Sequence, residues 1–251
     1  MRIVVALGGN ALLERGDRPD HDVQEHRVDV AVAALAPLAA EHELIVTHGN
    51  GPQVGMLALE SASDRVLSHP YPLDTLGAET QGLIGYWLAQ ALHNRLPGRE
   101  VIAVVTQTSV DPLDPAFDHP TKFVGPVYDR EESDIVAARH GWAMEPDGDR
   151  WRRVVASPEP GEIVEAVTIE RLVDAGVVVI CAGGGGVPAA SDPAGALAGV
   201  EAVIDKDLTS ALLAVRLGAD ALLLLTDVDG VYDHFGTTDA ELVRAATVRD
   251  L

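Results

Sequence analysis

Short apolar runs alternate with turn residues along much of the chain. Runs of this length bounded by glycine, asparagine or aspartate are typical of buried β-strands. The pattern predicts strands at residues 3–7, 44–47, 101–106, 177–181 and 221–225, with a further short strand at 202–204.

Helical periodicity occupies the segments between these runs. Apolar residues recur at helical spacing over residues 23–41, 83–92, 168–174 and 208–217. Gly176 and Gly218 follow the last two segments, where a helix C-terminal cap is expected. Repeated strand, turn and helix order predicts an α/β protein. Its mostly parallel central sheet would be covered by helices on both faces, as a three-layer sandwich.

Residues 111–153 interrupt the alternation. This stretch is rich in proline, aspartate, glycine and aromatic residues, and the regular order of strand and helix is lost. We interpret residues 1–251 as one domain with an inserted subdomain at 111–153 that protrudes as a small lid. The alternative is a long surface loop, although structureless loops of this length are uncommon in compact domains.

Composition and charge limit the classes of partner. The chain has 251 residues, of which 47% are hydrophobic, and a formal net charge of −21. This charge argues against nucleic acid as a partner, and a site for phosphates would have to build positive potential locally. No apolar run is long enough to span a bilayer, and Cys181 is the single cysteine, so no intramolecular disulfide can form. We expect a soluble cytoplasmic protein with no membrane partner.

The basic residues are unevenly chosen. Of 18 lysines and arginines, only Lys122 and Lys206 are lysine. A lysine that persists in an arginine-rich chain is a candidate for a role that a planar guanidinium cannot fill. Chance survival of two surface lysines is the alternative, and composition does not decide between them.

Three glycine-rich turns follow predicted strands: Gly8-Gly9-Asn10, Gly49-Asn50-Gly51 and Gly183 to Gly186. Turns at the carboxyl ends of parallel strands face the ligand crevice of an α/β sheet, and glycine lets the backbone approach an anion. None of the three fits the P-loop or dinucleotide fingerprint. Each alone is a weak signal, but together they favour a phosphate or carboxylate site.

Charged side chains near these turns could act in phosphoryl transfer, which depends on positioning and charge stabilisation. Lys206 lies between Asp205 and Asp207 just before a predicted helix, and Lys122 lies in the insertion. The alternatives are an ordinary helix-start cluster and a solvated loop charge. His48 could be a general base but is more often structural in such a position. The histidines show no metal-ligand spacing, so we expect no protein metal site.

Seven segments resemble the carbamate kinases, members of the amino-acid-kinase fold family, in order along nearly the whole chain. They are residues 4–12, 48–55, 122–128, 153–158, 181–188, 202–208 and 225–232. Relatives that phosphorylate amino acids usually carry a lysine just before the first glycine pair. The first strand here has none, which favours the carbamate branch.

The resemblance implies the amino-acid-kinase fold and a phosphoryl transfer between carbamoyl phosphate and ADP. The catalytic residues would be Lys122, Lys206 and Asp207. Substrate and phosphate would be held by Gly8, Gly9, Asn10, Gly49, Asn50 and Gly51. The nucleotide would contact Gly184, Gly185, Thr226, Asp227, Val231 and Tyr232. The resemblance also implies Mg²⁺ bound with ATP or ADP, a homodimer, and a place in arginine or purine breakdown.

The chain departs from the family at its end. Family members continue beyond the position of Leu251. Their continuation carries a Gly-Pro-Lys segment with a further active-site lysine, and closing sheet and helix elements. We therefore expect the 251 residues alone to have little or no kinase activity. A catalytically impaired homologue that binds nucleotide or carbamoyl phosphate stays open, as does a kinase of this fold that acts on another small acid.

Overall fold

The computed structural model describes residues 1–13, 17–226, 228, 230–247 and 249. Its central sheet has five parallel strands in the order β11, β1, β2, β8, β3. Their bounds are β1 (Arg2–Leu7), β2 (Glu43–His48), β3 (Val101–Ala103), β8 (Val178–Ile180) and β11 (Ala221–Leu225). All five strands expected in the sheet are confirmed, although β3 ends earlier than the apolar run suggested.

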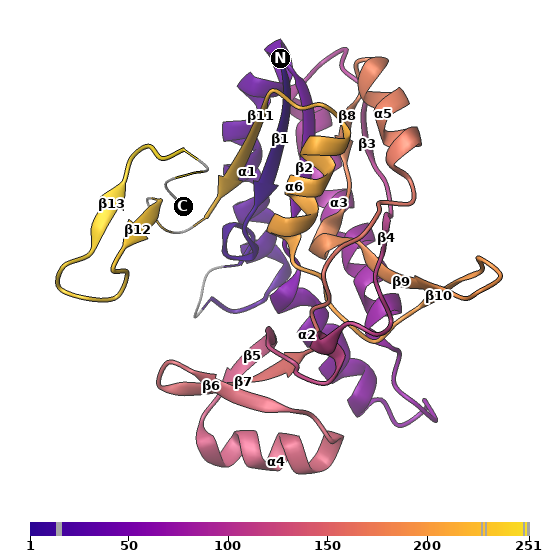
Figure 1. Ribbon diagram of the computed structural model, residues 1–251, viewed down its shortest axis with the longest axis vertical. Coiled ribbons are helices and arrows are strands. Elements are labelled where there is room, and N and C mark those ends of the chain that lie inside the picture. The colour runs from indigo at the N-terminus through magenta and orange to yellow at the C-terminus, as the bar shows by residue number, and fades with distance from the viewer. Residues whose placement is uncertain (14–16, 227, 229, 248, 250–251) are drawn as a thin grey trace.

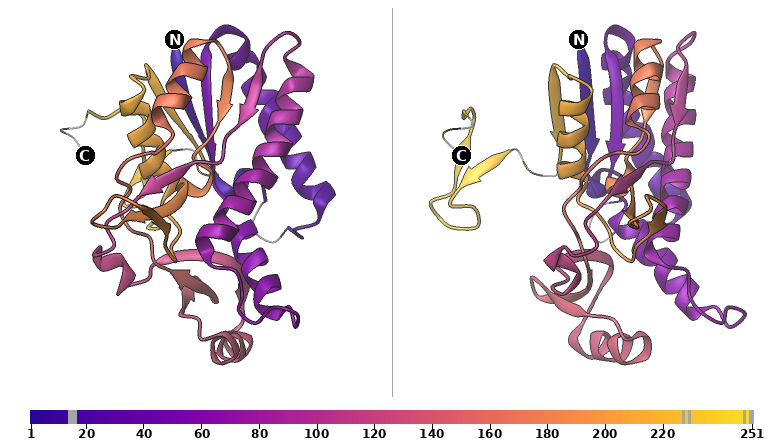
Figure 2. Two further views of the ribbon diagram at one scale, coloured as in Figure 1. Left: turned by 90° about the vertical axis from the view of Figure 1, so that its right-hand side faces the viewer. Right: turned by 45° about the vertical axis from the view of Figure 1, so that its right-hand side comes forward.

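Helices cover both faces of this sheet, which confirms the three-layer α/β fold (Figures 1 and 2). The helices α1 (His21–Glu41) and α3 (Leu73–Arg95) pack on one face, and α5 (Ala166–Asp174) and α6 (Lys206–Arg216) pack on the other. Strand periodicity divides β1 between the two layers, because successive side chains point to opposite faces. Its Ile3, Val5 and Leu7 join the first core and Val4 the second.

None of the helices in the described ranges is long and apolar enough to cross a membrane. The helix α3 has 23 residues, but charged and polar side chains such as Asp74 and Arg95 occur along it. Its buried residues instead form a stripe against the sheet, among them Ile84, Leu88 and Leu92.

A second sheet lies beside the carboxyl ends of the central strands. It contains β10 (Leu197–Gly199), β9 (Val187–Ser191) and β4 (Gln107–Ser109) in that order. The helix α2 (Gly51–Ser63) begins directly after β2, with Pro52 in its first turn. We did not predict this helix from the sequence.

A compact unit of one sheet and one helix occupies residues 122–155 and protrudes below the main body in Figure 1. It consists of β5 (Lys122–Tyr128), α4 (Arg130–His140), β6 (Met144–Asp147) and β7 (Arg150–Val155), with strand order β5, β7, β6. Its three strands pair antiparallel, so the order of parallel strand and helix is interrupted in this stretch, as the sequence indicated. We call it the small sheet unit; a lid with bounds 111–153 stays a prediction.

Two further parts of the chain differ from the sequence interpretation. Residues 202–204 are buried but form no strand, because Ala202 and Val203 donate backbone hydrogen bonds to Val200 and Ala156 instead of joining a ladder. The short strands β12 (Val231–Asp233) and β13 (Glu241–Val243) form a hairpin that we did not predict. This hairpin stands apart from the sheet body in Figure 2.

Candidate active site

A cavity of about 280 Å³ lies between the carboxyl ends of the central strands and the small sheet unit. It brings together most of the residues predicted from the sequence. The described residues that line it are Gly8, Gly9, Gly49, Asn50, Gly51, Pro52, Lys122, Phe123, Arg152, Gly184, Val203, Ile204, Lys206, Asp207 and Thr226.

The first two glycine turns abut one another at one wall of this cavity. The amide of Gly49 donates to the carbonyl of Leu7 at 2.9 Å, and the amide of Gly8 donates to Leu225 at 2.8 Å. A β-carbon on Gly49 would lie 2.8 Å from the backbone nitrogen of Gly9, which is too close for any side chain. The two turns therefore pack backbone against backbone at this wall, which glycine permits and a side chain on Gly49 would prevent.

The third glycine turn is packed against side chains from other segments. The amide group of Asn50 lies where a β-carbon on Gly184 would be, and its Nδ2 donates to Oγ1 of Thr80 in α3 at 2.8 Å. Gly184 has φ +63°, which also favours glycine. This turn thus fixes the orientation of Asn50 at the cavity wall, a role that the sequence did not suggest.

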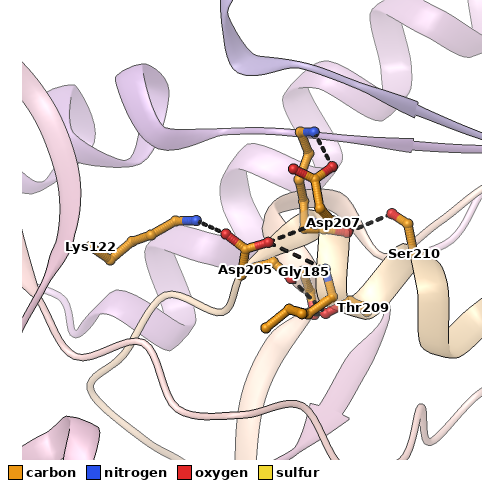
Figure 3. Close-up of polar contacts among 8 residues, drawn as sticks. Lys122, Gly185, Asp205, Asp207, Thr209 and Ser210 are labelled. Carbon is orange, nitrogen blue, oxygen red and sulfur yellow. Dashed lines mark hydrogen bonds and ion pairs between the residues drawn. The ribbon is translucent and has the colours of Figure 1, made fainter. Parts of the chain in front are cut away.

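The two lysines approach the cavity from different elements. Lys122 begins β5 and its Nζ donates to Oδ2 of Asp205 at 2.5 Å, as Figure 3 shows. Lys206 is the first residue of α6, and its Nζ donates to Oδ1 of Asp207 at 2.6 Å. Both side chains are largely shielded from solvent, with 29% and 14% of their surface exposed. This placement argues against two surface lysines retained by chance.

Basic side chains gather at the cavity, each beside a carboxylate. Among the described lining residues, Lys122, Arg152 and Lys206 are basic, and they pair with Asp205, Asp147 and Asp207 respectively. Sequence reasoning missed Arg152, although it immediately precedes one of the family-like segments. Its Nε donates to the carbonyl of Gly125 at 2.8 Å, which aligns it beside β5. In a chain of net charge −21, the cavity thus brings together cationic groups that an anionic ligand can contact.

His48 is not placed to act as a base. It is fully buried, and desolvation lowers its pKa to about 4, against a smaller raising effect of its hydrogen bond with the Gly49 carbonyl. Cys181 is also buried, and desolvation raises the pKa of its thiol to about 12. Both belong to the packed interior.

Several predicted residues are not brought to the cavity by the part of the chain that the structure describes. Gly185, Val231 and Tyr232 are not among the described lining residues. The backbone of Gly185 instead packs against Ile204 and accepts hydrogen bonds from Thr108 and Thr209. The side chain of Asn10 and the whole of Asp227 lie outside the described residues.

The donor set fits a magnesium ion that arrives with a nucleotide. Within the described ranges, no group of three histidines, cysteines, aspartates or glutamates could hold a metal ion. Asp207 presents a carboxylate at the cavity. Magnesium is commonly bound by one or two carboxylates together with substrate phosphates, so a cage made of protein ligands is not required.

Comparison with known families assigns the chain to a class. The model of the amino acid kinase family matches residues 1–251. The chain therefore belongs to the amino acid kinase family.

Individual relatives narrow this assignment. The carbamate kinase of Rhizobium meliloti is 51% identical over 254 residues, covering 100% of this chain and 78% of that protein. The carbamate kinase of Pyrococcus horikoshii is 45% identical over 258 residues, covering 100% of this chain and 82% of the relative. The structure of carbamate kinase from Giardia lamblia bound to citric acid superposes with a TM-score of 0.87 at 42% identity, covering 92% of this chain and 76% of that chain. The resemblance to the carbamate kinases seen in the motifs is confirmed.

Proposed function

We propose that this protein is a carbamate kinase, an ATP-dependent phosphotransferase that moves a phosphoryl group between carbamoyl phosphate and ADP. The observation that carries the proposal is identity of about half the residues to curated carbamate kinases along the whole chain. The cavity supports it, because glycine turns and basic side chains meet there.

The chemistry asks for positioning and charge neutralisation rather than covalent participation. We assign the backbone of Gly8, Gly9 and Asn10 to the phosphate near the point of transfer. The turn at Gly49, Asn50 and Gly51 would hold the carbamate or the moving group. Carbamate is already an anion, so its oxygen can attack without a base. A buried, neutral His48 is compatible with that requirement.

Lys122 and Lys206 would neutralise charge on the transferring phosphoryl group. They enter from different elements, so the group can be contacted from more than one direction. Asp207 holds the ammonium of Lys206 at 2.6 Å and would orient it. An ammonium that is already held in place need not reorient as charge develops in the transition state, so it stabilises that charge at little reorganisation cost.

The nucleotide would lie toward the end of β11. Thr226 follows this strand and lines the cavity. We extend the nucleotide site to Gly184, Gly185, Asp227, Val231 and Tyr232 on the family resemblance. Magnesium bound with ATP or ADP would supply further neutralisation of phosphate charge, and Asp207 is the described lining carboxylate that could contact it.

The wider setting is also a proposal. We infer a cytoplasmic homodimer that works in arginine breakdown and forms ATP from carbamoyl phosphate. The alternative, an impaired homologue that only binds these ligands, is not favoured by any described feature, since Lys122, Lys206 and Asp207 all lie at the cavity.

A coupled assay tests the function directly. ADP, magnesium and carbamoyl phosphate are supplied, and ATP formation is followed through hexokinase and glucose-6-phosphate dehydrogenase. The parent protein in this assay, and in the kinetic comparisons below, is a chain extended to the length of its relatives. We expect it to form ATP with carbamoyl phosphate, and Lys206→Ala to serve as the matched control of low activity. Much faster phosphorylation of glutamate or aspartate in the reverse assay would reject the substrate assignment.

A further inference from the structure

We propose that Asp205 is a positioning residue for phosphoryl transfer, which holds Lys122 over the cavity from across the boundary between the small sheet unit and α6. This inference rests on the proposed function. It concerns a residue that is not among those assigned to the site above.

The two oxygens of Asp205 have separate partners. Oδ1 accepts from the backbone amides of Asp207 and Leu208 at 2.8 and 3.2 Å, which caps the start of α6. Oδ2 accepts from Nζ of Lys122 at 2.5 Å. The cap fixes the carboxylate relative to the helix, so the remaining oxygen is a fixed anchor for the lysine (Figure 3).

This anchor joins two parts of the site. Asp205 immediately precedes Lys206 and Asp207, whereas Lys122 is 83 residues away in sequence at the start of β5. The small sheet unit also meets the main body where Gly55 of α2 packs directly on Gly125 of β5, so closely that a β-carbon on Gly55 would overlap it. The glycine contact sets where β5 lies, and the Asp205 contact sets where its lysine points.

The ion pair is suited to directing a side chain rather than to stabilising the fold. The side chains of Lys122 and Asp205 are 29% and 35% exposed. An ion pair of this exposure adds little to the free energy of unfolding. Burial raises the pKa of Asp205, but the hydrogen bond and charge of Lys122, together with the Leu208 and Asp207 amides, outweigh it and keep the pKa below its usual value. The anchor is therefore ionised near neutral pH.

If the contact between Asp205 and Lys122 had an inhibitory role, removing Asp205 would change turnover in the opposite direction. If Asp205 merely withheld Lys122 from the substrate, its removal would release the lysine and raise turnover. If Asp205 positions Lys122, its removal lowers turnover, because a free lysine samples many rotamers and is rarely in the productive one. A pure field effect is also distinct, since loss of a negative charge near the cavity would lower the KM for an anionic substrate.

The variants Asp205→Asn and Asp205→Ser separate the anchor from the cap. Asparagine and serine are both good N-cap residues, so α6 retains its start in each. Asparagine loses the charge and serine loses both the charge and the reach to Lys122. Asp129→Asn is the matched control, because Asp129 caps α4 by the same kind of bond, from the Glu132 amide to its side chain.

Steady-state kinetics in the ATP-forming direction give the first measurement. We expect both Asp205 variants to lower kcat about tenfold or more with little change in KM for carbamoyl phosphate, and Asp129→Asn to leave both unchanged. In a Lys122→Ala background, Asp205→Asn should change kcat less than about twofold, because a residue that acts through Lys122 has nothing left to position. A rise in kcat, or full additivity with Lys122→Ala, would overturn the proposal.

A second measurement needs no turnover. Reductive methylation with ¹³C-formaldehyde keeps the lysine charge and labels only Lys122, Lys206 and the amino terminus, since the chain has two lysines. The Lys122 signal, assigned through Lys122→Arg, should show restricted motion in the parent protein and the narrow line of a free lysine in Asp205→Asn. Asp129→Asn should not alter it. A parent protein that lacks kinase activity would contradict the proposed function, whereas an unchanged Lys122 signal in Asp205→Asn would contradict the positioning role.

Discussion

The imidazole of His48 occupies the place where a β-carbon on Gly183 would lie, with Nε2 2.4 Å from that position. His48 ends β2, and Gly183 begins the turn after β8, so this contact packs one glycine turn against another. The Nδ1 atom of the same ring lies 3.0 Å from the carbonyl oxygen of Gly49. One buried ring thereby fixes the spacing of two turns beside the cavity.

We predict that Gly183→Ala destabilises the protein by roughly 1–3 kcal/mol, the usual cost of overpacking a close-packed interior. The new methyl group can be accommodated only if His48 moves. Gly82→Ala is the control, because Gly82 is exposed in α3 and a β-carbon there meets nothing within 4 Å. The control should stabilise slightly, since alanine is the better helix former. Urea denaturation of both variants measures the difference, and equal stabilities would contradict the packing argument.

Acid should weaken the fold through His48. Burial lowers its folded pKa to about 4 from 6.5, so between these values the unfolded chain binds a proton that the folded one does not. The free energy of unfolding should therefore be intact above about pH 6.5 and fall by up to about 3 kcal/mol as pH drops to 4. Denaturation across this range in the parent and in His48→Gln measures it. The slope should be shallower in the variant, and identical slopes would exclude His48 as the cause.

Replacing Lys122 or Lys206 by alanine should lower kcat by a larger factor than it raises KM for carbamoyl phosphate. We expect Lys206→Ala to lower kcat on the order of a hundredfold or more, comparable to loss of one oxyanion donor. Lys122→Ala should also lower kcat, and Lys122→Arg should not fully restore it, because a planar fork does not reproduce a compact ammonium. The coupled assay gives kcat and KM for each variant.

Arg139→Ala is the control for these variants. Arg139 is exposed on α4, so its loss changes the net charge by the same amount without changing the cavity. Its kcat should match that of the parent protein. A near-normal kcat in both Lys122→Ala and Lys206→Ala would show that the two lysines have no catalytic role.

Cys181 should report on unfolding. Burial raises its thiol pKa to about 12, so neither access nor ionisation favours reaction with a disulfide reagent in the folded state. We expect no reaction with Ellman's reagent at pH 8 without denaturant, and one equivalent of thiol in guanidinium, since the chain has a single cysteine. Prompt reaction of the folded protein would show that the β8 region opens readily.

The apolar pattern predicted the main sheet because each of its strands is a short apolar run bounded by turn residues, although β3 and β11 are only partly buried. It did not predict α2, although Pro52 in the first turn is a helix-start signal. The segment is rich in glycine, and Gly55 is there for close packing on Gly125 rather than for a turn. A tertiary contact of this kind leaves no mark on local periodicity.

The individual strands and the helix of the small sheet unit were not predicted, for a related reason. Its strands are short and many of its residues are exposed, so the periodicity of apolar residues is weak. Its prolines and glycines are residues typical of loops. One signal was present, since Asp129 and Glu132 form a capping box at the start of α4. Arg152 was missed because only the pairing of β5 with β7 brings it to the cavity.

The pairing of β1 with β11 determines when the cavity can form during synthesis. Ile3 pairs with Ala221, and neighbouring contacts such as Arg2 with Asp220 span 218 residues. At about 5–20 residues per second, the ribosome takes roughly 10–45 s to supply β11 after β1 has been made. Until then β1 can pair only with β2 and keeps one open edge, and the Gly8 amide lacks its partner at Leu225. The pocket is completed late, so a nascent chain exposes a sheet edge well before it can bind a phosphate.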